Sequence, residues 1–572
     1  MINSQLLSVI EIFNFRLKSL FFFNISLIFI GVLFEVSGVG ILLPIINFIS
    51  KNDSGQVLDL FIIKLDVSNY TKYTVVFSYF SFILFFYSLK FLFFYFLNVK
   101  QSSFISNLSK SASNFFYEKY LNEDFETHIE KNPNKLIFNI QTEVSLFVDI
   151  IKSVLYLYSE ITVVVSMFFL LIFVQPVGTI SITILLFGVV YLYGKYQKKI
   201  TQELGIDKQR FDNIRYKYLT EGISGFKEVT IHNSKSFFIR NYKFNNDKFS
   251  DATSRFYFIS QISKTFLEFI AIFSLVLLVF ILLILRIDLN HIVSILGIFL
   301  LVAFRLLPSG SRIIASVQAL RYGRPTINLI TSEVTNSKSY NVPEDTLVYD
   351  YQFSSININK ITFKYSSAQD FILNNVSLII NKGETIGLVG KSGSGKSTFV
   401  NILLCLINPT SGDISCDSKS IFDDPKSWRR NIGYVPQSIY LLDGSIKNNI
   451  AFGIEEEYID FIKLKLAIRL AQLDEFVSEL SEGVDTLVGD RGVKISGGQR
   501  QRIGIARALY TDPEILVFDE ATSALDSKTE KDFMDTIYSL QNKTKIIITH
   551  SPSTLSNATR VFELNNGSLI NI

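Results

Sequence analysis

The sequence predicts an α-helical membrane domain with six transmembrane helices, followed by an α/β domain that carries a P-loop. Three observations predict this division. The 572 residues are 48% hydrophobic and 19% charged, whereas soluble domains contain about 25% charged residues. The long apolar segments all lie before Arg324, and the later ones are short, β-branched and separated by Gly, Asp and Ser, which is typical of a soluble α/β domain. We therefore expect the membrane domain at 1–324, a polar linker at 325–350 and the soluble domain at 351–572.

The composition excludes several classes of protein. Disordered chains, collagens and small disulfide scaffolds do not have this apolar content. The net charge of +3, from 55 Lys and Arg against 52 Asp and Glu, argues against a nucleic-acid partner. Cys405 and Cys416 are the two cysteines, both in the polar C-terminal part, which indicates a reducing compartment. No small-residue cleavage site follows the first apolar segment, so we expect no cleaved signal peptide.

Six segments approach or exceed the ~20 apolar residues that a bilayer-spanning helix needs. They are Leu20 to Phe48, Thr74 to Leu97, Val144 to Val174, Val177 to Tyr193, Phe256 to Leu285 and Ile292 to about Val317. A minimal turn at Gln175-Pro176 separates the third segment from the fourth. Buried helices of a large soluble core are the alternative, but several of these segments are too long and too uniformly apolar for it.

Lys and Arg are concentrated in two of the connections, between the second and third helices and between the fourth and fifth. The positive-inside rule therefore predicts that both loops and both termini are cytoplasmic. These loops have a helical, polar pattern and should extend the membrane helices into the cytosol. On the opposite side, Val57 to Leu65 is apolar with scattered charge and too short to span. We expect either an amphipathic helix on the outer membrane face or an ordinary packed loop there.

The stretch from Gly390 to Ser397 matches the P-loop pattern completely. It follows an apolar strand, Thr385 to Val389, and precedes a helical segment, which is the context that the motif requires. Glycine-rich backbone and a helix N-terminus together bind phosphate oxygens. We expect Lys396 to reach the β and γ phosphates and the Ser397 hydroxyl to bind Mg²⁺. The predicted nucleotide-binding residues are Gly390, Ser392, Gly393, Gly395, Lys396, Ser397 and Thr398.

A second apolar strand, from Ile515 to Phe518, ends in Asp519-Glu520. This places two carboxylates at the C-terminal edge of the strand, beside the P-loop. Asp519 is positioned to hold Mg²⁺, and Glu520 to polarise the attacking water as general base. Together with the P-loop, this pair predicts hydrolysis of ATP.

The stretch from Ile495 to Gln499, Ile-Ser-Gly-Gly-Gln, resembles the signature motif of ABC transporters, and further motifs of that family appear around it in the family's order. Tyr365 resembles the aromatic residue that stacks on adenine, Gln437 the Q-loop glutamine, Gly489 to Gly492 the X-loop of exporters, Ser523 to Asp526 the D-loop, and His550 the switch histidine. Ile495 replaces the usual Leu, and Ser551-Pro552 replaces the usual Arg-Leu. Residues 351–572 are thus identified as an ABC nucleotide-binding domain.

With the six preceding helices, the chain resembles an ABC half-transporter of the exporter type over nearly its whole length. The resemblance implies that Glu520, His550 and Gln437 are catalytic and that Gln437 joins Ser397 and Asp519 around Mg²⁺. It also implies that Ser496, Gly497, Gly498 and Gln499 bind the ATP held by a second chain. A homodimer is expected, with a heterodimer as the alternative, because all the catalytic motifs are present. Short coupling helices are expected at Asn122 to His128 and Leu219 to Val229, and ATP-driven alternating access is the implied mechanism.

The segment Phe304 to Ile314 resembles helix 6 of the bacterial PglK-type flippases for lipid-linked oligosaccharides. Phe34 to Pro44 and the apolar outer segment near Phe61 are similar to the same group. The resemblance implies a bacterial plasma (inner) membrane protein that moves an undecaprenyl-pyrophosphate-linked glycan to the outer leaflet, as in protein glycosylation. A broad-range drug, lipid or peptide exporter remains the alternative. An ATP-gated channel or regulator is disfavoured because the catalytic residues are intact.

Four cations, Lys90, Lys264, Arg305 and Arg312, lie in or at the ends of the predicted membrane helices. A charge at mid-bilayer costs at least ~2.5–3.5 kcal/mol, so each should face a wet cavity or have a partner. The two arginines are two helical turns apart and share a face, and paired donors suit a pyrophosphate. The PglK-type flippases also carry basic residues in helices 2, 5 and 6. The alternative is internal neutralisation, with Lys264 paired to Glu268 and with Glu35 and Glu160 paired to two others.

Overall fold

The computed structural model describes residues 2–41, 57–59, 64–66, 71–174, 176–285, 289–336, 353–365, 370–489, 492–522, 527–540, 542–550 and 552–572. These residues form two compact units. Unit 1 comprises Met1–Glu123 and Glu130–Asn341, and unit 2 comprises Asp124–Ile129 and Val342–Ile572.

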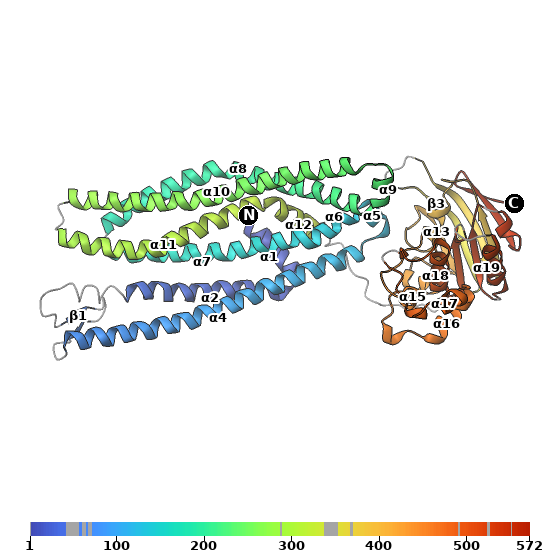
Figure 1. The fold of residues 1–572 in the computed structure, drawn as a ribbon, viewed down its shortest axis with the longest axis horizontal. Coiled ribbons are helices and arrows are strands. Elements are labelled where there is room, and N and C mark those ends of the chain that lie inside the picture. Colours follow the sequence, from blue (N-terminus) through green and yellow to red (C-terminus); the bar gives the residue numbers. More distant parts are fainter. Residues whose placement is uncertain are drawn as a thin grey trace. The chain divides into compact units, whose positions relative to one another are not determined.

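Unit 1 is built from long helices that run alongside one another (Figure 1). The long helices are α2 (Phe15–Gly40), α4 (Lys72–Leu121), α7 (Val144–Val174), α8 (Pro176–Ser224), α10 (Lys235–Ile284) and α11 (Leu289–Tyr322). Shorter helices are α1 (Ile2–Phe13), α6 (Pro133–Phe138), the π-helix η1 (Asn139–Glu143), α9 (Phe226–Ile231) and α12 (Arg324–Asn336). The six long helices coincide in order with the six predicted segments. The break at Pro176 fits a residue that lacks a donor N–H and favours the first turn of a helix.

Four of these segments, at Phe15–Gly40, Tyr73–Leu121, Pro133–Phe173 and Lys235–Ile284, are long and apolar enough to cross a membrane in the described part of the chain. α4 and α10 have 50 residues each and α8 has 49. Such helices are about 75 Å long, well beyond the ~30 Å hydrocarbon core of a bilayer. The prediction that the polar loops continue the membrane helices is therefore confirmed.

Apolar side chains remain uncovered along the long helices. Leu84, Phe85 and Phe91 of α4 are 70%, 68% and 69% exposed. Exposed apolar surface of this extent marks a contact with lipid or with another protein. One hydrophobic cluster of unit 1 lies at the other end of α4, where Phe104 and Phe116 are buried with side chains of α1, α7 and α12.

Two details differ from the sequence predictions. The predicted linker at 325–350 begins as α12, whose Ile327, Ile330 and Val334 are buried in the core of unit 1, because three apolar residues at helical spacing form a buried stripe. In the segment Val57 to Leu65, for which an amphipathic helix or a packed loop was expected, β1 (Val57–Asp59) pairs with β2 (Lys64–Asp66) in antiparallel register. The amphipathic helix considered for this segment is therefore not what its described residues form; residues 60–63 lie outside the described part.

Unit 2 contains two sheets. The six-stranded sheet has the order β12-β11-β5-β10-β9-β8 and is parallel except for β12. Its strands are β5 (Thr385–Val389), β8 (Ile432–Val435), β9 (Ile515–Asp519), β10 (Thr544–Ile548), β11 (Arg560–Asn565) and β12 (Ser568–Asn571). The antiparallel sheet β4-β3-β6-β7 consists of β3 (Ser355–Phe363), β4 (Leu373–Asn381), β6 (Ser411–Cys416) and β7 (Lys419–Ser420). β9 and β10 are buried along their whole length, as parallel strands covered on both faces must be.

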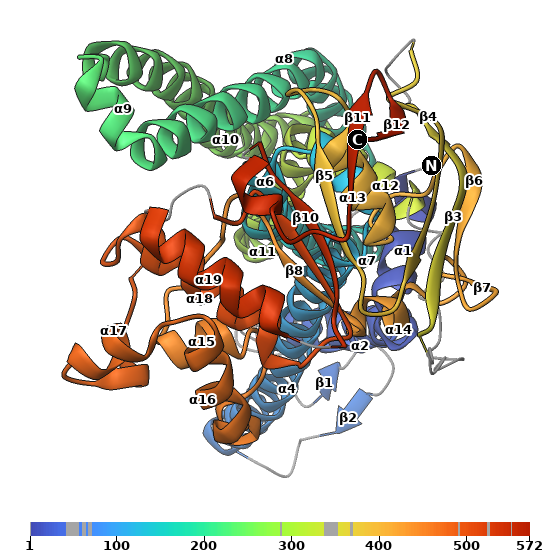
Figure 2. The ribbon, with the colours of Figure 1, turned by 90° about the vertical axis from the view of Figure 1, so that its right-hand side faces the viewer.

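The helices of unit 2 cover these sheets, and α15–α19 gather on one side of the unit (Figure 2). They are α13 (Lys396–Leu403), α14 (Pro425–Arg430), α15 (Ile446–Ile450), α16 (Phe461–Leu470), α17 (Asp474–Glu479), α18 (Gly497–Tyr510) and α19 (Ser527–Ser539). Trp428, the single tryptophan of the chain, is fully buried in α14 and donates its indole N–H to Leu403 O at 2.7 Å. α5 (Phe125–Glu130) falls largely in unit 2, and Phe125 packs against the core of that unit.

Candidate nucleotide-binding site

The carboxyl ends of three parallel strands bring the predicted nucleotide residues together. β5 leads into the P-loop, β9 ends at Asp519, and β10 leads to His550. β10 lies between β5 and β9 in the sheet, an order that the sequence does not predict. Ligands of open α/β sheets bind outside the carboxyl ends of the strands. The edge shared by these three strands is therefore the candidate site.

The P-loop has the backbone of a phosphate cradle. Gly393 and Gly395 have φ angles of 80° and 103°, which favour glycine. A Cβ on Gly395 would lie 3.0 Å from Ile372 O, so this position also lacks room for a larger residue. Gly395 is the N-cap of α13 and offers no side-chain hydrogen bond. The first N–H groups of α13 are therefore open to phosphate oxygens.

Lys396 and Ser394 have hydrogen-bonding capacity that fits a phosphate. Lys396 is 7% exposed, and its Nζ donates to Gly390 O at 2.7 Å and to Lys391 O at 3.1 Å. The buried Oγ of Ser394 has no hydrogen-bond partner among the described residues. Buried polar groups normally have partners, so this orphaned hydroxyl indicates that a ligand belongs here. The P-loop pattern leaves the position of Ser394 open, so the sequence did not reveal this residue.

The remaining P-loop residues lie around the start of α13. Ser392 and Ser397 are exposed, and Thr398 is 7% exposed. Ser397 directly follows Lys396 at the helix start, where its hydroxyl is accessible. Among the described residues, no group of three or more His, Cys, Asp or Glu side chains forms a metal site by itself. A Mg²⁺ ion here would depend on Ser397, Asp519 and the phosphates together.

Asp519 is a largely buried carboxylate, 9% exposed. The hydroxyl of Tyr434, on the neighbouring strand β8, donates to its Oδ2 at 3.5 Å. Burial and the adjacent charge of Glu520 raise the pKa of Asp519 above its usual value, while Tyr434 and the Lys396 ammonium oppose that rise. A bound cation would favour the charged form of this carboxylate, so its surroundings fit a Mg²⁺ ligand. Tyr434 was missed because a strand tyrosine carries no functional signal in a sequence.

Glu520 has an unusual backbone conformation. Its φ angle is 51°, and its N–H donates to Ile548 O of β10 at 2.9 Å. Left-handed conformations of non-glycine residues cost roughly 1–3 kcal/mol and cluster at functional sites. The strain supports a functional role for the side chain at this position, because glycine would relieve it.

Gln437 and His550 both contact the Glu520 carboxylate. Gln437 Nε2 donates to Oε2 at 2.6 Å, and His550 Nε2 lies 2.7 Å from Oε1. Gln437 is exposed and the His550 side chain is 51% exposed, whereas that of Glu520 is 17% exposed. The structure thus brings the three predicted catalytic residues together from three separate segments of the chain.

The signature residues form the start of α18. Ser496 is the N-cap, its Oγ accepts from Gln499 N at 3.2 Å, and its N–H donates to Gln499 Oε1 at 2.8 Å. This is a capping box. Gly497 and Gly498 are the first two residues of α18. Gln501, one turn further, donates from Nε2 to Glu520 O at 3.5 Å, a connection to the catalytic segment that the sequence did not reveal.

The other predicted motifs are placed in part. Tyr365 follows β3 and packs edge-on against Phe363, with ring centroids 4.9 Å apart. Asp490 and Arg491 of the X-loop, the D-loop Ser523 to Asp526 and Ser551 lie outside the described residues. A hollow of about 570 Å³ adjoins the P-loop and is lined by Gly390, Lys391 and His550 among others.

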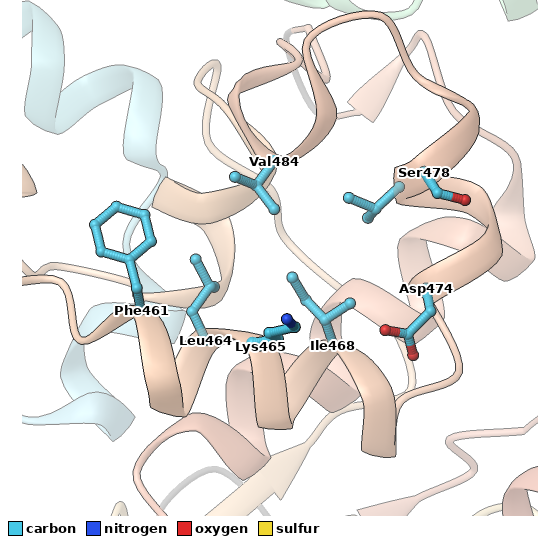
Figure 3. Close-up of a pocket in the computed structure, with 8 residues that line it drawn as sticks. Phe461, Leu464, Lys465, Ile468, Asp474, Ser478 and Val484 are labelled. Atoms are coloured by element: carbon cyan, nitrogen blue, oxygen red, sulfur yellow. The ribbon is translucent and has the colours of Figure 1, made fainter.

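A second hollow, of about 360 Å³, lies between α16, α17 and the turn near Val484 (Figure 3). Its lining is mostly apolar, with Phe461, Leu464, Ile468 and Val484 around Lys465 and Asp474. No predicted site residue lines this hollow.

The predicted membrane cations are mostly paired. Lys90 Nζ and Arg305 Nε each lie 3.0 Å from Oε2 of Glu35, and Arg312 Nε lies 2.6 Å from Oε1 of Glu160. The alternative of internal pairing to Glu35 and Glu160 thus holds, although two of the three cations share Glu35. Lys264 and Glu268 are both exposed, and the described structure shows no ion pair between them, so that part of the alternative is wrong.

Comparison with known proteins first gives the class. Residues 373–523 match the family model described as ABC transporter. A solved structure described as a bacterial Atm1-family ABC exporter with ATP bound has the same fold, with a TM-score of 0.76, 20% identity and coverage of 97% of this chain and 95% of that one. The fold is therefore that of an Atm1-family ABC exporter, a helical transmembrane domain plus an α/β ATP-binding domain, and the predicted fold class is confirmed.

Individual relatives then show how far the likeness extends. The chain is 46% identical over 214 residues to the alpha-hemolysin translocation ATP-binding protein HlyB of Escherichia coli O157:H7, covering 37% of this chain and 30% of that protein. It is 43% identical over 223 residues to the ATP-dependent lipid A-core flippase of Pseudoalteromonas translucida, covering 38% and 37%. The matched segment spans about a third of the length of these relatives. Their similarity supports an ATP-binding domain of ATP-dependent exporters.

Proposed function

We propose that this chain is one half of an ATP-driven exporter that flips a polyprenyl-pyrophosphate-linked oligosaccharide from the inner to the outer leaflet. The observation that carries the ATP-driven part is the convergence of Lys396, Asp519, Glu520 and His550 at one sheet edge. They belong to a chain whose whole length follows an exporter fold. A channel or regulator would not need this complete hydrolytic set.

Each residue of the site has a distinct role in hydrolysis. Lys396 and the α13 N-terminus hold the β and γ phosphates. Ser397, Asp519 and Gln437 would hold Mg²⁺, which would neutralise phosphate charge. Glu520 accepts a proton from the attacking water. His550 and Gln437, which both contact Glu520, keep its carboxylate oriented toward the γ phosphate.

A second copy of the chain is required to complete the site. The capping box at Ser496 presents the N-terminus of α18 and its glycines, a suitable surface for the phosphates bound by a partner. In the short helix α9, Phe226 and Ile231 are 64% and 63% exposed. We assign α9 and α5 as the coupling helices. The expected segment, Leu219 to Val229, contains the end of α8 and four of the six residues of α9, because α8 continues to Ser224.

The substrate assignment depends on cations in the membrane helices. Lys90, Arg305 and Arg312 belong to α4 and α11, and their side chains are 18%, 23% and 48% exposed. Lys264 of α10 is exposed. Arg groups that keep free donors suit a pyrophosphate. The name of the lipid A-core flippase relative also supports a lipid substrate. The name of the alpha-hemolysin translocation relative supports the alternative function, a drug, lipid or peptide exporter.

We place the chain in the bacterial inner membrane, and the Lys and Arg residues of the long loops support cytoplasmic ATP-binding domains and termini. The homodimer then holds two equivalent ATP sites. Protein glycosylation is one pathway that uses such a lipid-linked glycan.

The test is translocation by the purified chain in proteoliposomes. Arg305→Ala, Arg312→Ala and the double variant are compared with the unchanged chain for flipping of a lipid-linked glycan and for basal ATPase. We expect flipping to fall sharply while basal hydrolysis persists. Unchanged flipping would reject the anion site, and loss of both activities with misfolding would assign the arginines to structural pairing. Extrusion of apolar dyes without glycan flipping would favour the alternative exporter.

A further inference from the structure

Two cations share one carboxylate where α2, α4 and α11 meet. Lys90 Nζ and Arg305 Nε both approach the same oxygen of Glu35, at 3.0 Å each. The side chains of Lys90, Arg305 and Glu35 are 18%, 23% and 12% exposed. This group, named the Glu35 cluster below, therefore carries one net positive charge in the apolar part of the helices.

The neighbouring pair in the same bundle is balanced. Arg312 faces Glu160 one to one, at 2.6 Å. Because an uncompensated charge within a membrane costs at least ~2.5–3.5 kcal/mol, purely structural pairing should give every cation its own carboxylate. The Arg312–Glu160 pair meets that condition. In the Glu35 cluster two cations share one carboxylate among the described residues. A further anion is therefore needed to balance the second cation.

The Glu35 cluster also contains N–H donors that make no hydrogen bond in the described part of the chain. Arg305 uses Nε for Glu35 and Nη1 for Ser309 Oγ at 3.4 Å, and its Nη2 makes no hydrogen bond in the described part of the chain. Lys90 makes one hydrogen bond, and its ammonium otherwise lies 5.2 Å from the Tyr87 ring and 5.9 Å from the Phe94 ring. An ammonium has three donors and a guanidinium five. Several N–H groups thus remain for an incoming oxyanion.

We propose that Glu35 is a resident counter-anion, displaced from Lys90 and Arg305 by a substrate group that carries more than one negative charge. This inference rests on the proposed function for the identity of the substrate. A monoanion that replaces a carboxylate brings no additional charge, whereas a pyrophosphate brings more charge and more acceptor oxygens to the same two cations. Glu35 therefore discriminates against the monoanionic phosphodiesters of ordinary phospholipids, which compete for any basic site in a bilayer.

The experiment measures lipid binding to the full chain in nanodiscs of neutral lipid. The probes are a polyprenyl pyrophosphate, phosphatidylglycerol as the monoanionic competitor, and the neutral polyprenol. In Glu35→Gln we expect the affinity for the pyrophosphate to rise about tenfold, the equivalent of about 1.4 kcal/mol, and the preference over phosphatidylglycerol to fall. Glu11→Gln is the matched control, because it removes a carboxylate from a one-to-one pair with Lys18, at 2.8 Å, that is not part of the proposed anion site. Its pyrophosphate affinity should stay unchanged.

Equal or weaker pyrophosphate binding by Glu35→Gln, or the same gain in Glu11→Gln, would overturn the proposal. If Glu35→Gln does not fold, the pyrophosphate affinity of Lys90→Met tests the proposal instead. It leaves one cation on one carboxylate, so the pyrophosphate affinity should fall by at least about tenfold, and an unchanged affinity would overturn the proposal.

The outcome separates this inference from the proposed function. A chain that flips the lipid-linked glycan but binds the pyrophosphate equally with and without the Glu35 carboxylate retains the function and loses the inference. A chain that binds as expected but flips no glycan retains the counter-anion and loses the flippase assignment.

Discussion

Replacing Glu520 by glutamine tests the assignment of the general base most directly. Glutamine has the same shape, but it cannot take a proton from the attacking water. In the structure one carboxylate oxygen contacts His550 Nε2 and the other accepts from Gln437 Nε2. An amide keeps one acceptor, so one of the two contacts is lost, a net cost of about 0.5–1.5 kcal/mol. No contact to Lys396 or the P-loop changes.

The expected result of Glu520→Gln is therefore selective. Loss of a general base lowers turnover by about 10²- to 10⁴-fold, whereas ATP binding should stay close to normal. Phosphate release by the purified full chain measures turnover, and a labelled ATP analogue measures binding. Glu514→Gln is the control, because Glu514 is also near β9 but pairs with Lys382 at the surface, at 2.7 Å. Near-normal turnover in Glu520→Gln would remove this residue from the catalytic role.

Two further predictions concern the nucleotide-binding domain. In Lys396→Ala, nucleotide binding should weaken by about 10- to 100-fold, because hydrogen bonds to charged groups contribute about 1.5–3 kcal/mol; retained affinity for the labelled analogue would contradict the placement of its ammonium. The second prediction is that unit 2 loses stability in acid as Glu384 is protonated. Burial by itself raises the pKa of Glu384, but its hydrogen bonds with Arg560 and Asn381 outweigh that effect and lower the pKa below its usual 4.5. Since the unfolded chain then binds more protons, this stabilisation is complete above about pH 4.5 and is lost as the pH falls through the lowered value.

The emission of Trp428 reports the acid effect, because the single tryptophan is fully buried in unit 2. Denaturant unfolding of the full chain followed at this residue should show a smaller loss of stability in acid for Glu384→Gln than for the unchanged chain. Equal slopes below pH 4.5 would contradict the role of Glu384. Glu563→Gln, on the nearby strand β11, controls for the removal of a carboxylate as such.

Local patterns were sufficient for the elements and for most of the site. The helices were predictable because long apolar runs and Pro176 determine where a helix spans and breaks. The P-loop was predictable because its glycine conformations depend on a few adjacent residues. The β9 carboxylates followed from a short apolar strand with polar residues at its end.

Other features depend on which distant segments pack together. β10 separates the strands that lead to Lys396 and Asp519, and strand order results from the tertiary arrangement of crossovers. Ser394 becomes notable only when its hydroxyl is found buried without a protein partner. The segment Val57–Asp59 forms a strand because it pairs with a second strand, Lys64–Asp66, in antiparallel register. An isolated amphipathic pattern does not specify that pairing.

The charges within the membrane helices show the same division. Composition and spacing by themselves established that four cations lie in apolar segments and that each needs a partner or water, because the cost of a buried charge is a property of the residue and the solvent. Only the tertiary structure decided that Glu35 would receive both Lys90 and Arg305 while Glu160 received Arg312 alone. These partners are brought together from distant helices, Glu35 and Arg305 being 270 residues apart. Ion pairing depends on distances of a few ångströms, which are set by helix packing and not by the order of residues.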